Sequence, residues 1–185
     1  MQKQLVLTIL ADDQPGVVEQ IASIIINHKG NWTQSSMSRL GGKFAGILLA
    51  DINSQNDSSL QEALLNLNNQ GIKVTIESAL ATKVKEQKTV QIEIVANDRS
   101  GIIGEISTLC ANKNINLESL ESCCESAPMS ASMLFRAHAS VRLPAGMSDN
   151  QLRALLEELS SDLMVEIINS QKLIVLQRPS DSLQP

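Results

Sequence analysis

The sequence predicts an α+β fold built from two tandem β-α-β-β-α-β units, each with an antiparallel sheet and helices on one face. The first observation is an internal repeat, because Leu5–Gln34 aligns without gaps with Val90–Ser119 at an offset of 85 residues. Seven aligned positions are identical: Ile9/Ile94, Ala11/Ala96, Asp13/Asp98, Gly16/Gly101, Ile21/Ile106, Asn27/Asn112 and Asn31/Asn116. The second observation is a pair of later segments with apolar residues at helical spacing: Leu60, Ala63, Leu64 and Leu67, then Leu152, Leu155, Leu156 and Leu159.

The first half of the first unit follows from periodicity and turn residues. Leu5, Leu7 and Ile9 alternate in a strand over Gln4–Ala11. Asp13 and Pro15-Gly16 then open a helix that runs to about His28 and ends at Gly30.

The second half of this unit begins with a strand that runs to about Arg39. Gly41-Gly42 predicts a hairpin into a strand over Lys43–Ile52. Ser58 and Gln61 have the spacing of a capping box and begin a second helix, which Gly71 ends. Ile72, Val74 and Ile76 form the last strand.

The second unit repeats this order from Thr89 to about Leu176. Its strand Met133–Leu143 alternates apolar with polar residues, and Ser148 and Gln151 repeat the capping box. The helical segments align at an offset of 92, so this unit has seven extra residues, which we place in the turn at 126–130. The predicted domains are residues 1–82 and 88–177, joined by a linker over about 80–87 and followed by a flexible tail over 178–185.

The composition argues against several classes of protein. Only 2% of the 185 residues are aromatic, which leaves an aliphatic core and no stacking platform for single-stranded nucleic acid. The net charge of −5 lacks the basic excess that binds a phosphate backbone. No apolar stretch is long enough to cross a membrane, and no targeting segment is visible. Adjacent cysteines such as Cys123 and Cys124 rarely form a disulfide with each other. We therefore expect a protein of the reducing cytoplasm with no direct contact to nucleic acid or membrane.

The candidate sites are the two loops from the first strand of each unit to its first helix, residues 11–16 and 96–101. A helix N-terminus offers free N–H groups and positive partial charge to a carboxylate. Gly16 and Gly101 let a ligand approach the backbone, and Asp13 and Asp98 can accept hydrogen bonds from a ligand ammonium group. In the alternative interpretation, which the residues alone favour, these aspartates only cap their helices.

The loop Asp13-Gln14-Pro15-Gly16, the amphipathic helix after it and Gly30-Asn31 at the next strand resemble the signature of the ACT domain. The resemblance covers about Leu5–Leu176 and implies the ferredoxin-like topology of small regulatory modules. It also implies that an amino acid binds at an interface between two such domains, through the first strand–helix loop and the start of the second strand. By position, the ligand-binding candidates are Asp12, Asp13, Gln14, Pro15, Gly16 and Asn31, and in the second unit Asn97, Asp98, Arg99, Gly101 and Asn116.

The second loop departs from the pattern of that family. Arg99 stands in place of Gln14, and Ser100 in place of Pro15, so the two loops differ chemically. Arg99 can clamp a carboxylate with two hydrogen bonds, or it can be a surface ion-pair partner of little energetic weight.

Two ACT-like units without a catalytic domain resemble the family of glycine cleavage system transcriptional repressors. This resemblance implies a non-enzymatic repressor that binds an activator protein, has no DNA-binding domain and responds to glycine. The alternative is a stand-alone amino-acid-binding module that regulates a metabolic enzyme. We expect a homodimer, no catalytic residue, no metal and no cofactor. An acylphosphatase-like enzyme is not expected, because Asp12-Asp13-Gln14 would repel phosphate in the loop that must bind it.

The remaining notable side chains are expected to be structural. Cys123 and Cys124 share a strand and so point to opposite faces, with a redox role left open. Cys110 lies on the apolar stripe of a helix, and Trp32 is expected to pack in the core. His28 is expected to cap a helix C-terminus, where a cation is favoured.

Overall fold

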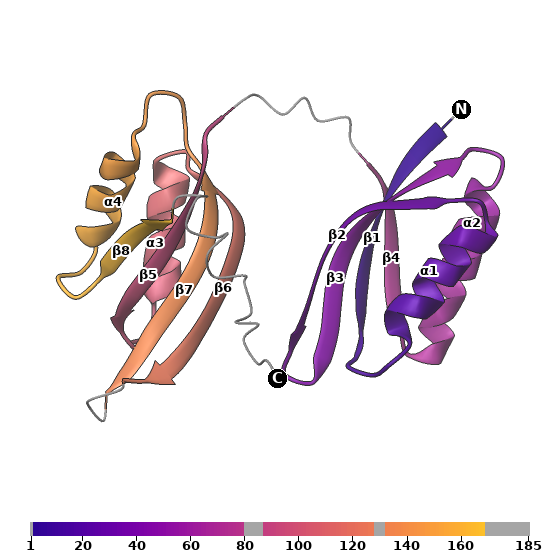
Figure 1. Cartoon of the computed structure of the whole chain (residues 1–185), viewed down its shortest axis with the longest axis horizontal. Coiled ribbons are helices and arrows are strands. Elements are labelled where there is room, and N and C mark those ends of the chain that lie inside the picture. Colours follow the sequence, from indigo (N-terminus) through magenta and orange to yellow (C-terminus); the bar gives the residue numbers. More distant parts are fainter. Residues whose placement is uncertain (1, 80–86, 128–131, 169–185) are drawn as a thin grey trace, which may run out of the picture. The chain divides into compact units, whose positions relative to one another are not determined.

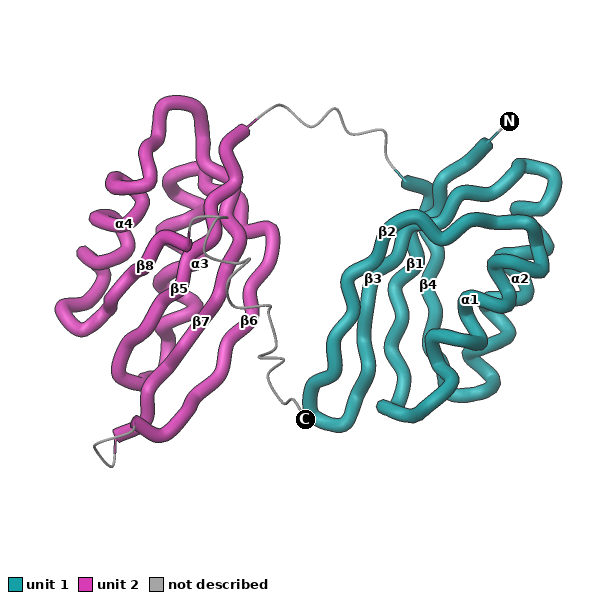
Figure 2. Tube along the Cα trace, viewed as in Figure 1, with its two compact units in different colours: residues 1–83 teal, residues 84–185 magenta. Residues whose placement is uncertain are grey.

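The computed structural model describes residues 2–79, 87–127 and 132–168. The chain divides into two compact units, residues 1–83 and 84–185 (Figure 2). The tail predicted over 178–185, the last residues of the second predicted domain (169–177) and all of the predicted linker except Gln87 lie outside the described residues.

The first unit has the predicted order of elements. Its bounds are β1 (Gln2–Asp12), α1 (Val17–Asn27), β2 (Asn31–Leu40), β3 (Lys43–Asn53), α2 (Asp57–Asn66), a single 3-10 turn η1 (Leu67–Gln70) and β4 (Lys73–Ser78). Gly41 and Gly42 form the β2–β3 hairpin turn with φ angles of 58° and 76°, a conformation that glycine adopts without steric cost.

Among its described residues, the second unit repeats the order of strands and α-helices. Its bounds are β5 (Thr89–Asn97), α3 (Ile102–Asn112), β6 (Asn116–Ser126), β7 (Met133–Arg142), α4 (Asp149–Glu157) and β8 (Met164–Ile168). The seven extra residues are divided, which corrects the prediction of a single insertion. Arg39 pairs with Phe44, whereas the equivalent Cys124 pairs with Phe135, so six of the seven lie in the β6–β7 hairpin. The seventh lies between Val141 and Leu152.

Each unit has one antiparallel four-stranded sheet, in the order β2-β3-β1-β4 in the first and β6-β7-β5-β8 in the second. Both helices of each unit lie on one face of its sheet (Figure 1). The α+β prediction of two tandem ferredoxin-like units is therefore confirmed. The paired strands are in equivalent register, since Leu5 faces Ala50 in the first sheet and Val90 faces Val141 in the second.

Each unit has its own aliphatic core. In the first, Leu5, Leu7 and Ile9 of β1 pack with the helix residues Ile21 and Leu64, and in the second the equivalent layer includes Ile92, Ile94, Ile106 and Leu156. The prediction that Cys110 is a core residue is confirmed, and Trp32 packs against the first core from its edge. Full burial of a Leu or Ile side chain contributes about 1.5–3 kcal/mol, so each unit is stabilised chiefly by this layer.

The starts of the second helices differ between the units. At α4 the predicted capping box of Ser148 and Gln151 is confirmed. At α2 the prediction is wrong, because the N-cap is Asn56 and no side chain caps the helix. Gln61 instead donates to the carboxylate of Asp57 at 2.7 Å, and Lys3 of β1 forms an ion pair with that carboxylate.

Candidate functional site

The loop between β1 and α1 ends on a glycine in the left-handed conformation. Gly16 is the N-cap of α1 with φ 96°, and no side chain caps this helix. The interpretation that Asp13 is the helix cap is therefore wrong. Gln14 and Pro15 are exposed in the same loop. The first-turn N–H groups of α1 thus lack a side-chain acceptor, which is the local condition for receiving a carboxylate.

Both aspartates of this first loop face cations from the β2–β3 hairpin. Asp13 accepts from Arg39 Nη1 at 3.2 Å, and Asp12 forms an ion pair with Lys43. Arg39 is 73% exposed and Asp13 is 35% exposed, so the first pair contributes little to stability. The pair matters for the charge of the loop, because neighbouring cations already neutralise the two loop carboxylates.

The loop between β5 and α3 has the same backbone but different partners. Gly101 is the N-cap of α3 with φ 98°, again without a side-chain cap, so Asp98 is not a helix cap either. Cys124 and Asp98 line one hollow beside this loop, and the Asp98 carboxylate raises the pKa of the Cys124 thiol above its ordinary value. The backbone N–H of Asn97 donates to Asp162 Oδ2 at 3.0 Å.

Arg99 of the second loop forms a two-pronged ion pair. Its Nη1 and Nη2 atoms each lie 2.6 Å from one carboxylate oxygen of Glu105, in the first turn of α3. The hydrogen bonds from Arg99 hold the pKa of Glu105 below its ordinary value. Of the two interpretations of Arg99, the structure shows the surface ion pair.

A hollow of about 530 Å³ opens beside this second loop. Its lining includes Asp98, Arg99, Gly101, Cys124 and Phe135. The lining comes from the loop itself, the first turn of α3 and the adjoining ends of β6 and β7. A carboxylate, a guanidinium and a helix N-terminus therefore meet at one place on the second unit.

The two asparagine candidates lie away from these loops. Asn31 opens β2 and pairs with Asp51 at the end of β3, whereas Asp12 pairs with Lys43 at the start of β3. At roughly 3.3 Å per residue, the ten residues of β2 span about 30 Å, so Asn31 and Asp13 lie at opposite ends of the sheet. Asn116, paired with Arg142, is placed in the same way in the second unit. Within each unit the structure brings the loop candidates together and leaves the asparagine apart.

Sequence reasoning did not identify Arg39, Lys43, Cys124, Glu105 and Asp162 as neighbours of the loops. Arg39 and Cys124 stand at the same offset of 85 residues as Asp13 and Asp98, so the repeat contained a signal for them. The repeat shows that Arg39 and Cys124 occupy equivalent positions. It does not show that these positions lie beside the loop aspartates, because that depends on how the strands pair.

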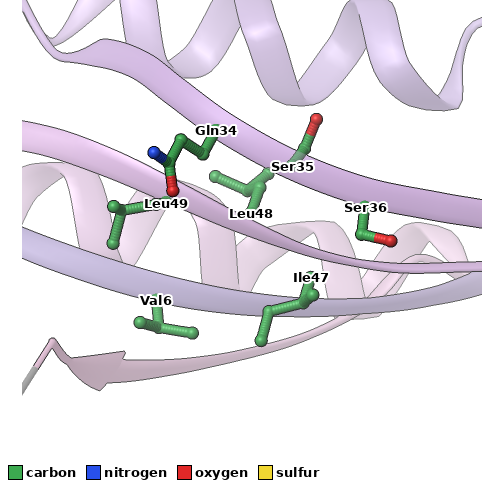
Figure 3. A pocket seen from close by; sticks show the side chains of 7 residues that line it. All are labelled: Val6, Gln34, Ser35, Ser36, Ile47, Leu48 and Leu49. Atoms are coloured by element: carbon green, nitrogen blue, oxygen red, sulfur yellow. The ribbon is translucent and has the colours of Figure 1, made fainter. Parts of the chain in front are cut away.

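The sheet face opposite the helices differs between the units. In the first unit, the exposed Ile47 lies with Val6, Leu49, Gln34 and Ser36 around a shallow hollow of about 350 Å³ (Figure 3). In the second unit, this face carries ion pairs of Arg136 with Glu93 and Glu125, and of Arg142 with Glu118. One face is thus mainly apolar and uncharged at its centre, and the other is charged.

The remaining predicted side chains are placed as follows. Burial raises the pKa of the Cys110 thiol, and Cys123 and Cys124 are exposed. The ring of His28 lies 2.8 Å from the carbonyl oxygen of Ile24, so its role at the end of α1 is confirmed. In residues 2–79, 87–127 and 132–168, no three His, Cys, Asp or Glu side chains cluster as metal ligands would. None of the described helices combines the length and apolar character that a membrane span requires.

Comparison with known proteins agrees with this arrangement. A family model described as ACT domain matches residues 3–77, and a second model of the same description matches residues 90–143. The crystal structure of an unknown protein from Galdieria sulphuraria is 24% identical, with a TM-score of 0.77 over 91% of this chain and 100% of the other. A protein proposed to be a glycine cleavage system transcriptional repressor is 20% identical, with a TM-score of 0.67 over 91% of this chain and 97% of the other. A search of curated proteins gives no match.

Proposed function

Since this chain belongs to the ACT-domain family, with one ACT domain in each half, we propose that it is a non-enzymatic regulator that senses a small amino acid. The observation that carries the proposal is the repeated loop. In both domains a left-handed glycine opens the first helix without a side-chain cap, and an aspartate stands three residues before it. The helix end suits a ligand carboxylate, and the aspartate suits a ligand ammonium group.

We further propose that the chain is a repressor of the glycine cleavage system and that its ligand is glycine. A protein of the same fold is proposed to have that repressor function. The net charge of −5 disfavours direct binding to DNA, so the repressor would act by binding an activator protein. Glycine would then relieve the repression.

The physical mechanism is a difference in affinity between two states of the protein. If glycine binds one arrangement better and the activator binds the other better, each ligand weakens the binding of the other by the same factor. A tenfold effect corresponds to a coupling free energy of about 1.4 kcal/mol.

The separation of Asn31 from Asp13 bears on the proposed oligomeric state. The ACT resemblance assigns both the loop and the start of the second strand to the ligand, yet these lie at opposite ends of each sheet. The asparagine that contacts a ligand would therefore belong to a different domain from the loop. A second copy of the chain can supply it, which is why we propose a homodimer, and light scattering with and without glycine tests that.

The experiment for amino-acid sensing is calorimetric titration of the full chain with glycine, then serine, alanine and larger amino acids. Asp13→Asn and Asp98→Asn variants locate the loop. Saturable binding of glycine that one of these variants weakens supports the proposal. The absence of binding by every amino acid would overturn it.

The alternative regulator is an amino-acid-binding module that controls a metabolic enzyme, for which the same loops suffice. Purification of the tagged chain from its own cells, in buffers with and without glycine, separates the two. Recovery of a DNA-binding activator that glycine releases supports the repressor, whereas recovery of a metabolic enzyme supports the alternative.

A further inference from the structure

Arg39 and Cys124 occupy the same position in the two domains. Both stand 26 residues after the loop aspartate, and both pair across the hairpin with a phenylalanine, Phe44 or Phe135. Arg39 Nη1 lies 3.2 Å from Asp13 Oδ2, and Cys124 lines the same hollow as Asp98. The fold therefore contains one residue position that faces the loop, occupied by a cation in the first domain and a neutral group in the second.

The charges around the two loops differ as a result. In the first domain, Asp12 and Asp13 face Lys43 and Arg39, so two carboxylates are matched by two cations. In the second domain, Asn97 replaces Asp12 and Leu134 takes the place of Lys43 beside it.

Arg99 does not compensate for the missing cations of the second loop. It is held by Glu105, and Asp162 adds another carboxylate at the Asn97 backbone. Asp98 is in none of the ion pairs among the residues that the structure describes. The second loop thus keeps an unneutralised carboxylate at the edge of the 530 Å³ hollow.

We infer that the two ACT domains are functionally unequal: the loop of the second domain receives the ammonium group of the amino acid at Asp98, and the loop of the first is closed to it by Arg39. This inference rests on the proposed function and names the working site. The residue beside the loop aspartate is the determinant, because a guanidinium neutralises the carboxylate that a ligand ammonium needs, whereas an uncharged thiol leaves that negative charge in place.

The thiol suits this role because it stays protonated. The neighbouring Asp98 carboxylate raises the pKa of Cys124, so the thiol stays uncharged at neutral pH. An uncharged neighbour leaves the negative charge of the carboxylate available to an ammonium group, which forms a stronger charge-assisted bond. A raised pKa also argues against a redox role, since the thiolate is the reactive form.

The test exchanges the two residues in the full chain and measures glycine binding by calorimetry. The wild type should bind one glycine per chain. Cys124→Arg should weaken this binding about tenfold or more, the scale of one added unit charge a few ångströms away at a surface. Cys124→Ser, which keeps a neutral hydroxyl donor, should bind within about twofold of the wild type. Arg39→Cys should raise the number of bound glycines from one towards two.

Two further measurements check that Cys124→Arg folds and that glycine binds beside Cys124. Cys124→Arg should fold, because the first domain holds an arginine at the equivalent position, and circular dichroism melting checks this. In a Cys123→Ser background, glycine should slow alkylation of Cys124, the exposed thiol that remains.

The outcomes separate this inference from the proposed function. Two results would overturn the inference that the domains are unequal but would still support an amino-acid sensor. The first is glycine binding that is unchanged in Cys124→Arg, and the second is binding that is lost in Asp13→Asn and kept in Asp98→Asn. Two equal sites in the wild type would do the same. Failure of the wild type to bind any amino acid would overturn both.

Discussion

Ser148 and Gln151 exchange hydrogen bonds across the first turn of α4. The Gln151 N–H donates to Ser148 Oγ at 3.3 Å, and the Ser148 N–H donates to Gln151 Oε1 at 2.8 Å. Ser58 and Gln61 have the same spacing in the first domain, but there Ser58 lies one residue inside α2 and Gln61 binds Asp57. The two serines can therefore be compared directly, because Ser148 caps its helix and Ser58 does not.

Loss of the cap should cost stability only in the second domain. Ser148→Ala should lower the free energy of unfolding by about 1 kcal/mol, because an N–H of α4 loses its acceptor. Ser58→Ala is the control and should change it by less than about 0.5 kcal/mol. Urea unfolding followed by circular dichroism measures both. Equal effects of the two substitutions would contradict the assigned caps.

Substitution of alanine for two glycines should change the stability of the protein in opposite directions. A Cβ at Gly46 would lie 2.9 Å from the Ser36 carbonyl oxygen and closer still to Met37 Cγ, whereas a Cβ at Gly104 meets nothing within 4 Å. Gly46→Ala should destabilise by about 1–3 kcal/mol through overpacking between β2 and β3. Gly104→Ala lies inside α3 and should stabilise by about 0.5–1 kcal/mol. Thermal melting measures both shifts, and destabilisation by Gly104→Ala would contradict the open space described at α3.

The Asp57 ion pair should make the stability of the first domain depend on pH. Hydrogen bonds from Lys3 and Gln61 lower the pKa of this buried carboxyl, so its stabilising contribution is present at neutral pH and is lost as pH falls through the lowered value. Asp57→Asn should cost about 2 kcal/mol at pH 7, and the difference from the wild type should shrink as the pH falls below about 4.

The control for this prediction is Asp12→Asn, which removes an exposed ion pair with Lys43. It should change the free energy of unfolding by less than about 1 kcal/mol, both at pH 7 and at acidic pH. Urea titrations at several pH values provide the comparison. A pH-independent cost of Asp57→Asn would show that the carboxyl acts through packing and not through its charge.

The three thiols should differ in reactivity. Cys110 is buried and should react with an aromatic disulfide reagent only after unfolding, whereas Cys123 and Cys124 are exposed and should react in the native protein. Asp98→Asn should speed the alkylation of Cys124 at neutral pH, because it removes the charge that raises the pKa of that thiol. Asp13→Asn is the control and should leave the rate unchanged. Mass spectrometry of timed samples identifies the alkylated residue.

Local patterns were sufficient to predict the fold but not the surroundings of the loops. Alternation in β1 and helical spacing in α1 depend on residues a few positions apart, which is why the order of elements is confirmed. The capping box predicted at Ser58 is absent because α2 begins earlier, with Asn56 as its N-cap. Gln61 donates instead to Asp57, which pairs with Lys3 more than fifty residues away. The aspartates failed as caps because Gly16 and Gly101 take the N-cap position themselves.

The sequence by itself determined that this chain has two copies of one βαββαβ unit, since an apolar period and a repeat can be seen without coordinates. Only the tertiary structure decided what each loop aspartate faces. Arg39 and Cys124 reach Asp13 and Asp98 because β2 and β6 run back along their sheets to the end where the loops lie. A contact of that kind depends on strand register, which pairs residues far apart in the chain and leaves no local pattern.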